Sequence, residues 1–240
     1  MDLRRGRFVV LDGSDGVGKA TQTDRLVKKL REEGHRVHVL DFPQYGKNLF
    51  ADTVSAYLRN EFGLATHVNP YLASLPYTLD RFKVAPEIRE SLRKGEVVVS
   101  NRFTSASVGH QGAKIIGPEK RAQYIEWLNR AEFSREGLDL PRPDLTVILD
   151  VDPVTAHVLV GRKGDREYTR GKRRDAHERD LDYQKRVAEV FKEVAASDPT
   201  WRLINCMSSQ GKGILKPETI AKKVWGVVSP YLPRSLESLS

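Results

Sequence analysis

The chain has 240 residues, of which 30% are charged and 39% are hydrophobic, and its formal net charge at pH 7 is +8. These values are ordinary for a globular protein and exclude an intrinsically disordered chain, while the length favours one domain. The chain has no apolar run long enough for a bilayer, no signal-peptide core and a single cysteine, Cys206, which together predict a cytoplasmic protein without a membrane partner.

Short apolar stretches alternate with helical patterns along the whole chain. In chain order, the patterns predict a strand over 7–12, a helix ending at Gly34, a strand over 35–42, helices over 48–60 and 70–94, and a strand over 96–101. In the second half of the chain they predict a helix over 118–133, a strand over 144–152, helices over 153–162 and 178–196, a strand over 201–206 and a helix over 217–231. Such alternation is typical of an α/β fold with a doubly wound, five-stranded parallel sheet and helices on both faces. Because ligands bind at the carboxyl ends of such strands, we expect the site in the loops after Asp12, Asp41, Asn101 and Asp150.

A glycine-rich segment, GSDGVGK over 13–19, follows the first strand and opens the first helix. Glycines let successive backbone N–H groups wrap a phosphate at the positive end of the helix, and Lys19 reaches the β- and γ-phosphates. The alternative is a glycine-rich turn that happens to precede a lysine. The motif predicts an ATP site formed by Gly13, Ser14, Asp15, Gly16, Val17, Gly18, Lys19, Ala20 and Thr21.

Ala20 stands where such a loop normally carries a hydroxyl that binds Mg²⁺. Mg²⁺ keeps several waters in most nucleotide sites and takes only one or two protein oxygens. We therefore expect a weakened metal site in which Asp15 supports Mg²⁺ directly or through water. Loss of nucleotide binding is the alternative.

Further motifs follow the loop in a fixed order. They are Phe42-Pro43-Gln44-Tyr45-Gly46, then Tyr77 and Arg81 in LPYTLDR, then Asn101-Arg102-Phe103, then Gln111-Gly112, and finally PDLTVILDVDP over 143–153. As an ordered set they resemble the motifs of the thymidylate kinase family over nearly the full length. The resemblance implies a P-loop kinase domain over 1–240, a phosphotransferase that moves the γ-phosphate of ATP to dTMP, giving dTDP, with Mg²⁺ as cofactor.

The same motifs carry a candidate acceptor site. Arg81 and Arg102 each present a planar donor fork suited to phosphate, with a surface ion pair as the alternative for each. Phe42 and Tyr77 offer flat apolar faces, although core packing is the default for such aromatics. The resemblance implies that they stack on the base, and that the remaining substrate contacts come from Asp15, Tyr45, Ser107, His110, Gln111 and Gln184.

Within that set, the resemblance places His110 near the sugar, and Ser107 and Gln184 near the thymine edge. An aromatic residue often holds the place of His110 and blocks a 2′-hydroxyl, so a polar His110 makes deoxyribose selection weaker. A structural histidine is an equally good interpretation. The resemblance also implies an acid before Arg102, where this chain has Asn101, which thins the negative charge around the cation.

A basic segment over 161–179 holds eight Lys or Arg and four Asp or Glu. The phosphate loop contains no arginine between Asp15 and Val17, so the cation that stabilises phosphoryl transfer must come from elsewhere. We expect this segment to be a closing lid, with Arg162 and Arg166 joining Lys19, Asp15 and Arg102 as catalytic residues. A solvated basic loop is the alternative.

Three other functions compete with a dTMP kinase. One is a kinase for another nucleotide or deoxynucleotide, or for a deoxynucleoside, the last with Asp41 as base. Another is a nucleotide-binding protein whose transfer chemistry is impaired by Ala20 and Asn101. Nucleic-acid binding through the basic segment ranks last, and we expect none. The family commonly pairs through helices, so we expect a homodimer, with Trp127 or Tyr124 on an exposed face.

Overall fold

The computed structural model describes residues 5–161, 180–208 and 213–232. Its strands form one parallel sheet in the order β2-β3-β1-β4-β5. The strands are β1 (Arg7–Gly13), β2 (Val37–Asp41), β3 (Val97–Asn101), β4 (Leu145–Asp150) and β5 (Trp201–Asn205). The predicted five-stranded, doubly wound sheet is confirmed. Because β1, β3 and β2 are neighbours, the loops that leave their carboxyl ends meet at one edge.

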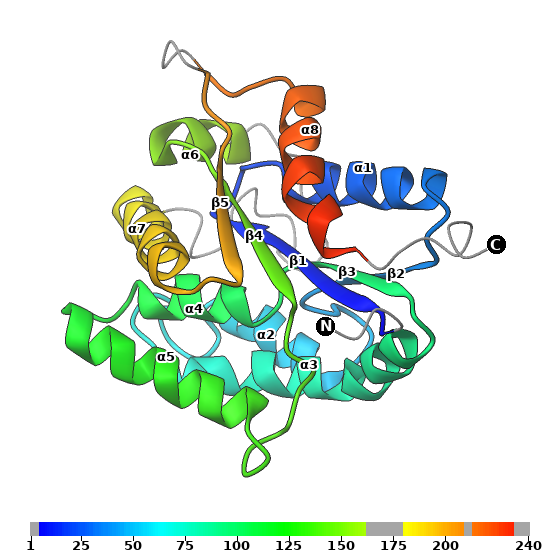
Figure 1. Cartoon of the computed structure of the whole chain (residues 1–240). Helices are drawn as coiled ribbons and strands as arrows, with labels where there is room; N and C mark the ends of the chain where they lie inside the picture. Colours follow the sequence, from blue (N-terminus) through cyan, green and yellow to red (C-terminus); the bar gives the residue numbers. More distant parts are fainter. Residues whose placement is uncertain (1–4, 162–179, 209–212, 233–240) are drawn as a thin grey trace.

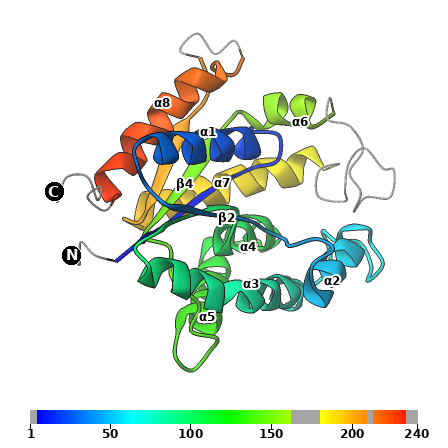
Figure 2. The ribbon, with the colours of Figure 1, turned by 90° about the vertical axis from the view of Figure 1, so that its right-hand side faces the viewer.

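Helices cover both faces of the sheet (Figures 1 and 2). One layer holds α1 (Lys19–Glu32) and α8 (Pro217–Val228), and the opposite layer holds α3 (Pro70–Arg93), α4 (Thr104–Gly112) and α7 (Leu181–Ser197). Outside the second layer, α5 (Pro118–Phe133) packs on α3 and α4, and α2 (Leu49–Leu58) packs on α3. The short helix α6 (Pro153–Gly161) contacts α7. None of the helices in the described part of the chain has the length and apolar character needed to span a membrane.

The central strand explains why the strand patterns are nearly all apolar. In β1, Val9 and Leu11 pack into the core beneath α1 and α8, whereas Phe8 and Val10 pack into the core beneath α3. Both faces are covered, so both sets of alternate side chains are buried. The sheet is therefore a rigid base for the loops at its carboxyl edge.

One helix, α4, was not predicted from the sequence. All nine of its residues are buried, but most are small or polar, so its sequence has no apolar stripe to give a helical period. Small residues allow the close packing: a Cβ added at Gly109 would lie 2.4 Å from the ring of Phe191 in α7. By contrast, the long helix predicted over 70–94 is confirmed, and it continues through Pro76 and Pro86.

Candidate functional site

A cavity of about 260 Å³ opens at the carboxyl ends of β1, β2 and β3, close to the lower end of the range of about 300–1,000 Å³ typical of small-ligand pockets. Many of the residues predicted for the site line it, namely Asp15, Gly16, Gly18, Lys19, Ala20, Phe42, Tyr45, Tyr77, Arg102, Ser107, His110 and Gln111. Other lining residues are Asp41, Pro43, Leu58, Asn101 and Ala106. Phosphate-loop residues and acceptor residues thus share one cavity.

The phosphate loop has a backbone that only glycine accommodates at two points. Gly18 has φ of 88° and precedes the first residue of α1, which is Lys19. A Cβ added at Gly13 would lie 2.5 Å from the carbonyl oxygen of Leu149 in the neighbouring strand. The Nζ of Lys19 donates hydrogen bonds to the carbonyl oxygens of Gly13 and Ser14, at 2.9 and 2.8 Å. The loop therefore presents main-chain N–H groups and a fixed ammonium group, a combination that binds phosphate.

Asp15 joins the loop to the end of β3. Its Oδ1 accepts a hydrogen bond from Nη2 of Arg102 and lies 3.6 Å from Nζ of Lys19. Arg102 has φ of 68°, an uncommon backbone conformation for a residue with a side chain, and it is held by a hydrogen bond from its N–H to Leu11 O at 2.9 Å. The result is a carboxylate between two cations, at the point where the two halves of the cavity meet.

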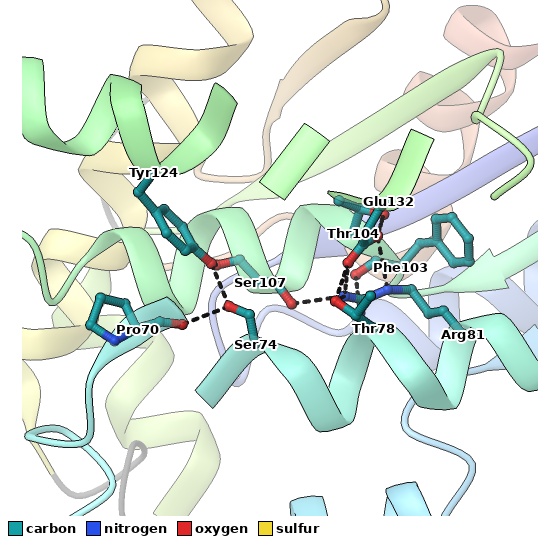
Figure 3. A network of polar contacts seen from close by, with 9 residues as sticks. All are labelled: Pro70, Ser74, Thr78, Arg81, Phe103, Thr104, Ser107, Tyr124 and Glu132. Carbon is teal, nitrogen blue, oxygen red and sulfur yellow. Dashed lines mark hydrogen bonds and ion pairs between the residues drawn. The ribbon is translucent and has the colours of Figure 1, made fainter. Parts of the chain in front are cut away.

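Arg81 has a different environment from the exposed phosphate fork or surface ion pair expected from the sequence. It is 1% exposed, and its guanidinium forms an ion pair with Glu132 of α5, which is 0% exposed. Figure 3 shows the two side chains pointing toward one another, with Thr78 and Thr104 beside the carboxylate. Arg81 also donates to the hydroxyl of Ser107 at 3.0 Å. Arg81 thus lies behind the cavity wall and contacts it through Ser107.

Aromatic side chains form the apolar part of the cavity. Phe42 is buried and meets Phe103 edge to face, with ring centroids 5.5 Å apart. Tyr77 is half-buried and meets Tyr57 edge to face at 6.2 Å. Phe42 and Tyr77 therefore each pack against a second aromatic ring and also line the cavity. Rings held in this way offer flat apolar surfaces on which a base can stack.

His110 is buried at the inner end of the cavity. The pKa of His110 is lowered to about 3, chiefly by burial; Asp15 opposes this effect, and the Arg102 and Lys19 cations add to it. The imidazole is therefore neutral at physiological pH, and it contributes hydrogen-bonding capacity and shape without charge.

The remaining predicted residues do not line the cavity. Gly13, Ser14 and Val17 form the buried frame of the loop, Thr21 is exposed on α1, and Gln184 is buried in α7. Arg162 and Arg166 lie outside the described residues, as does the segment 162–179.

Several residues that lie near the cavity without lining it were missed by sequence reasoning. Asp12 is completely buried, and burial raises its pKa. Its carboxylate accepts hydrogen bonds from Gly13 N at 2.9 Å and from Ser105 Oγ at 2.6 Å, and the second of these links β1 to α4. Lys114 donates to the Tyr57 hydroxyl at 2.6 Å, and burial lowers the pKa of Lys114 to about 7. Glu132 had no motif to mark it, because its partner Arg81 lies on another helix.

The predicted dimer face on α5 is wrong at Tyr124. Tyr124 is completely buried, and its hydroxyl forms hydrogen bonds with Ser74 Oγ at 2.7 Å and Ser107 O at 3.2 Å. Trp127 is partly buried against Tyr71, with ring centroids 4.8 Å apart. Both aromatics belong to the core beneath α4 and α7.

Comparisons with known proteins agree with this geometry. The family profile described as Thymidylate kinase matches residues 11–214. A thymidylate kinase from Mycobacterium tuberculosis is 32% identical over 190 residues, covering 79% of this chain and 86% of that protein. One from Synechococcus sp. is 32% identical over 228 residues, covering 94% and 96%. Among solved structures, the thymidylate kinase from Candida albicans superposes with a TM-score of 0.68 at 22% identity, over 95% of this chain and 92% of that chain, which supports the fold. The chain therefore belongs to the thymidylate kinase family.

Proposed function

We propose that the protein transfers the γ-phosphate of ATP to dTMP and so forms dTDP. The observation that carries the proposal is the shared cavity, which Lys19 lines from the phosphate loop and Arg102 lines from the end of β3. Asp15 binds both cations and so fixes their separation. Two phosphate groups lying end to end would each meet one of these cations, as phosphoryl transfer between nucleotides requires.

The residue roles follow from this placement. The segment 13–21 would bind the phosphates of ATP through its main-chain N–H groups and Lys19. Arg102 would bind the acceptor phosphate, and Phe42 and Tyr77 its base, while the other acceptor contacts would come from Asp15, Tyr45, Ser107, His110 and Gln111. Arg81 would act from behind the cavity wall by positioning Ser107, and Gln184 does not line the cavity. No general base is required, because a phosphate acceptor is already anionic and catalysis consists of alignment and charge neutralisation.

The residues present fit a Mg²⁺ ion that nucleotide phosphates and water hold in large part. In the described part of the chain, no group of three or more His, Cys, Asp or Glu side chains is arranged to hold a metal. Mg²⁺ in nucleotide sites takes only one or two protein oxygens. The carbonyl Oδ1 of Asn101, on a cavity-lining residue, is buried and has no hydrogen-bond partner among the described residues. Bound Mg²⁺ would neutralise charge on the transferred group.

The wider organisation belongs to the same proposal. We propose one kinase domain over residues 1–240, in the cytoplasm, with Arg162 and Arg166 as additional catalytic residues, although both lie outside the described residues. The protein pairs with a second copy and takes no nucleic acid or membrane partner. The support for pairing is a set of exposed apolar side chains, one at the start of α2 and three on α3, namely Leu49, Leu72, Leu75 and Phe82.

An acceptor panel tests the activity. ADP release is measured by a coupled assay with ATP, Mg²⁺ and one of dTMP, dUMP, dGMP or dCMP. The proposal predicts the highest kcat/KM with dTMP. A higher value with another nucleotide would replace dTMP as the substrate. ATP binding by calorimetry without turnover of any acceptor would establish a nucleotide-binding protein instead.

A further inference from the structure

Asp15 is poorly suited to support a divalent cation, although the sequence favoured it. Its carboxylate accepts a hydrogen bond from Arg102 and lies 3.6 Å from the ammonium of Lys19. Both the residue and the ammonium are almost fully buried, so these charges interact with little screening by solvent. A carboxylate whose charge is already shared by two cations attracts a third cation only weakly.

The cavity contains a second carboxylate, Asp41, in a different position. The register of the β2–β3 pair places Asp41 directly beside Asn101, and Nδ2 of Asn101 donates to Oδ1 of Asp41 at 2.8 Å. Among the described residues, Asp41 forms no ion pair. Its direct hydrogen-bond partner is a neutral amide, so the carboxylate contributes a negative charge to the cavity, where Ala20 and Asn101 also lie.

The hydrogen bond also fixes the orientation of Asn101. Because Nδ2 faces Asp41, the carbonyl Oδ1 is the remaining polar atom of the side chain, and it is buried without a hydrogen-bond partner among the described residues. A buried carbonyl oxygen without a partner is costly unless a ligand or a water satisfies it. Carboxylate and amide oxygens are both suitable partners for the waters that Mg²⁺ retains.

We propose that Asp41 and Asn101, rather than Asp15, are the protein oxygens that support the divalent cation of the bound nucleotide. The pair compensates for two departures at once. Ala20 supplies no hydroxyl, and Asn101 supplies no negative charge. Asp41, which lies beside Asn101 in the register of the sheet, supplies a carboxylate at the same edge. The inference rests on the proposed function, because the cation arrives with ATP or ADP.

Mn²⁺ binding tests the inference independently of catalysis. Electron paramagnetic resonance reports free Mn²⁺, so its titration into protein with saturating ADP gives a dissociation constant for the cation. Asp41→Asn removes the charge and keeps the shape, and we expect it to weaken Mn²⁺ binding about 10- to 100-fold, the usual cost of losing a residue that supports a metal through its ligands. Asn101→Ala should weaken binding in the same direction.

Two controls make the result specific. Asp52→Asn removes an exposed carboxylate on α2, outside the cavity, and should bind Mn²⁺ as the wild type does. ADP affinity measured with EDTA should stay unchanged in Asp41→Asn, which also confirms that this variant is folded. If Asp41→Asn fails to fold, Asn101→Ala carries the comparison.

The inference and the proposed function fail in different ways. Mn²⁺ affinity in Asp41→Asn within twofold of the wild type would overturn the inference, and so would a large loss in Asp15→Asn without one in Asp41→Asn. Wild-type protein that binds ADP with Mn²⁺ and loses Mn²⁺ in Asp41→Asn, yet phosphorylates no dTMP, would support the inference and overturn the proposed function.

Discussion

Replacing Glu132 by glutamine would remove one negative charge from a site that solvent does not reach. Glu132 is 0% exposed and Arg81 is 1% exposed. The carboxylate accepts from Arg81 Nε at 3.2 Å and from Thr78 Oγ1 at 2.7 Å, and also from the Thr104 hydroxyl. In Glu132→Gln the guanidinium keeps its charge without a counter-charge, and the new amide places donors opposite the donors of Arg81.

Breaking one side of such a buried pair costs about 3–5 kcal/mol. That is a large share of the roughly 5–15 kcal/mol by which a typical protein is stable. For a chain of this size, it lowers Tm by about 6–20 °C, taking about 2–4 °C for each kcal/mol. Urea unfolding followed by circular dichroism, with differential scanning calorimetry for Tm, measures both quantities.

Two comparisons make the test sharp. Glu136→Gln breaks the exposed pair with Arg130, in which both side chains are about three-quarters exposed, and should leave stability unchanged. The double substitution Arg81→Met with Glu132→Leu removes both buried charges and should recover most of the lost stability. A loss below about 1 kcal/mol in Glu132→Gln, the scale of an exposed pair, would refute the buried ion pair.

Other predictions concern the site directly. Arg81→Met with Glu132→Leu should raise the KM for dTMP far more than the KM for ATP in steady-state assays; equal changes would remove Arg81 from the acceptor site. Lys19→Ala should abolish transfer while its circular dichroism spectrum stays unchanged, and retained turnover would contradict the phosphate-loop assignment. Ala20→Ser should lower the Mg²⁺ concentration that gives half-maximal rate, and an unchanged requirement would mean that position 20 does not affect the cation. Burial lowers the pKa of Lys114 from 10.5 to about 7, so between these values the unfolded chain binds more protons and stability rises with pH. The Tm of the wild type relative to Lys114→Met should therefore increase from pH 7 to pH 9, whereas a constant difference would place the Lys114 pKa outside this interval.

The sheet and the phosphate loop were predictable because backbone requirements determine them. Strands covered on both faces favour runs of consecutive apolar side chains, and residues 8–11 of β1 and 97–99 of β3 follow this pattern. A loop that wraps a phosphate needs glycine where a Cβ would collide or where φ is positive, as at Gly13 and Gly18. Such requirements leave a local trace in the sequence.

Contacts between distant segments left no comparable trace. The helix α4 was missed because it has no apolar stripe, although every face of it is buried. The pairing of Arg81 with Glu132 joins residues 51 positions apart, so the sequence suggested an exposed guanidinium where the fold buries one. The contact between Asp41 and Asn101 depends on the pairing and register of β2 and β3. The sequence pattern of each strand taken separately does not reveal which strands are neighbours. The chemistry of each residue type was predictable, whereas its partner was not.

A crystal structure with ADP and dTMP bound tests the central claim most directly. The account predicts that the β-phosphate of ADP lies against the N–H groups of the segment 16–19 and that the dTMP phosphate lies within hydrogen-bond distance of Arg102, in the same cavity. A dTMP phosphate bound elsewhere, with Arg102 turned away from it, would contradict the shared-cavity mechanism.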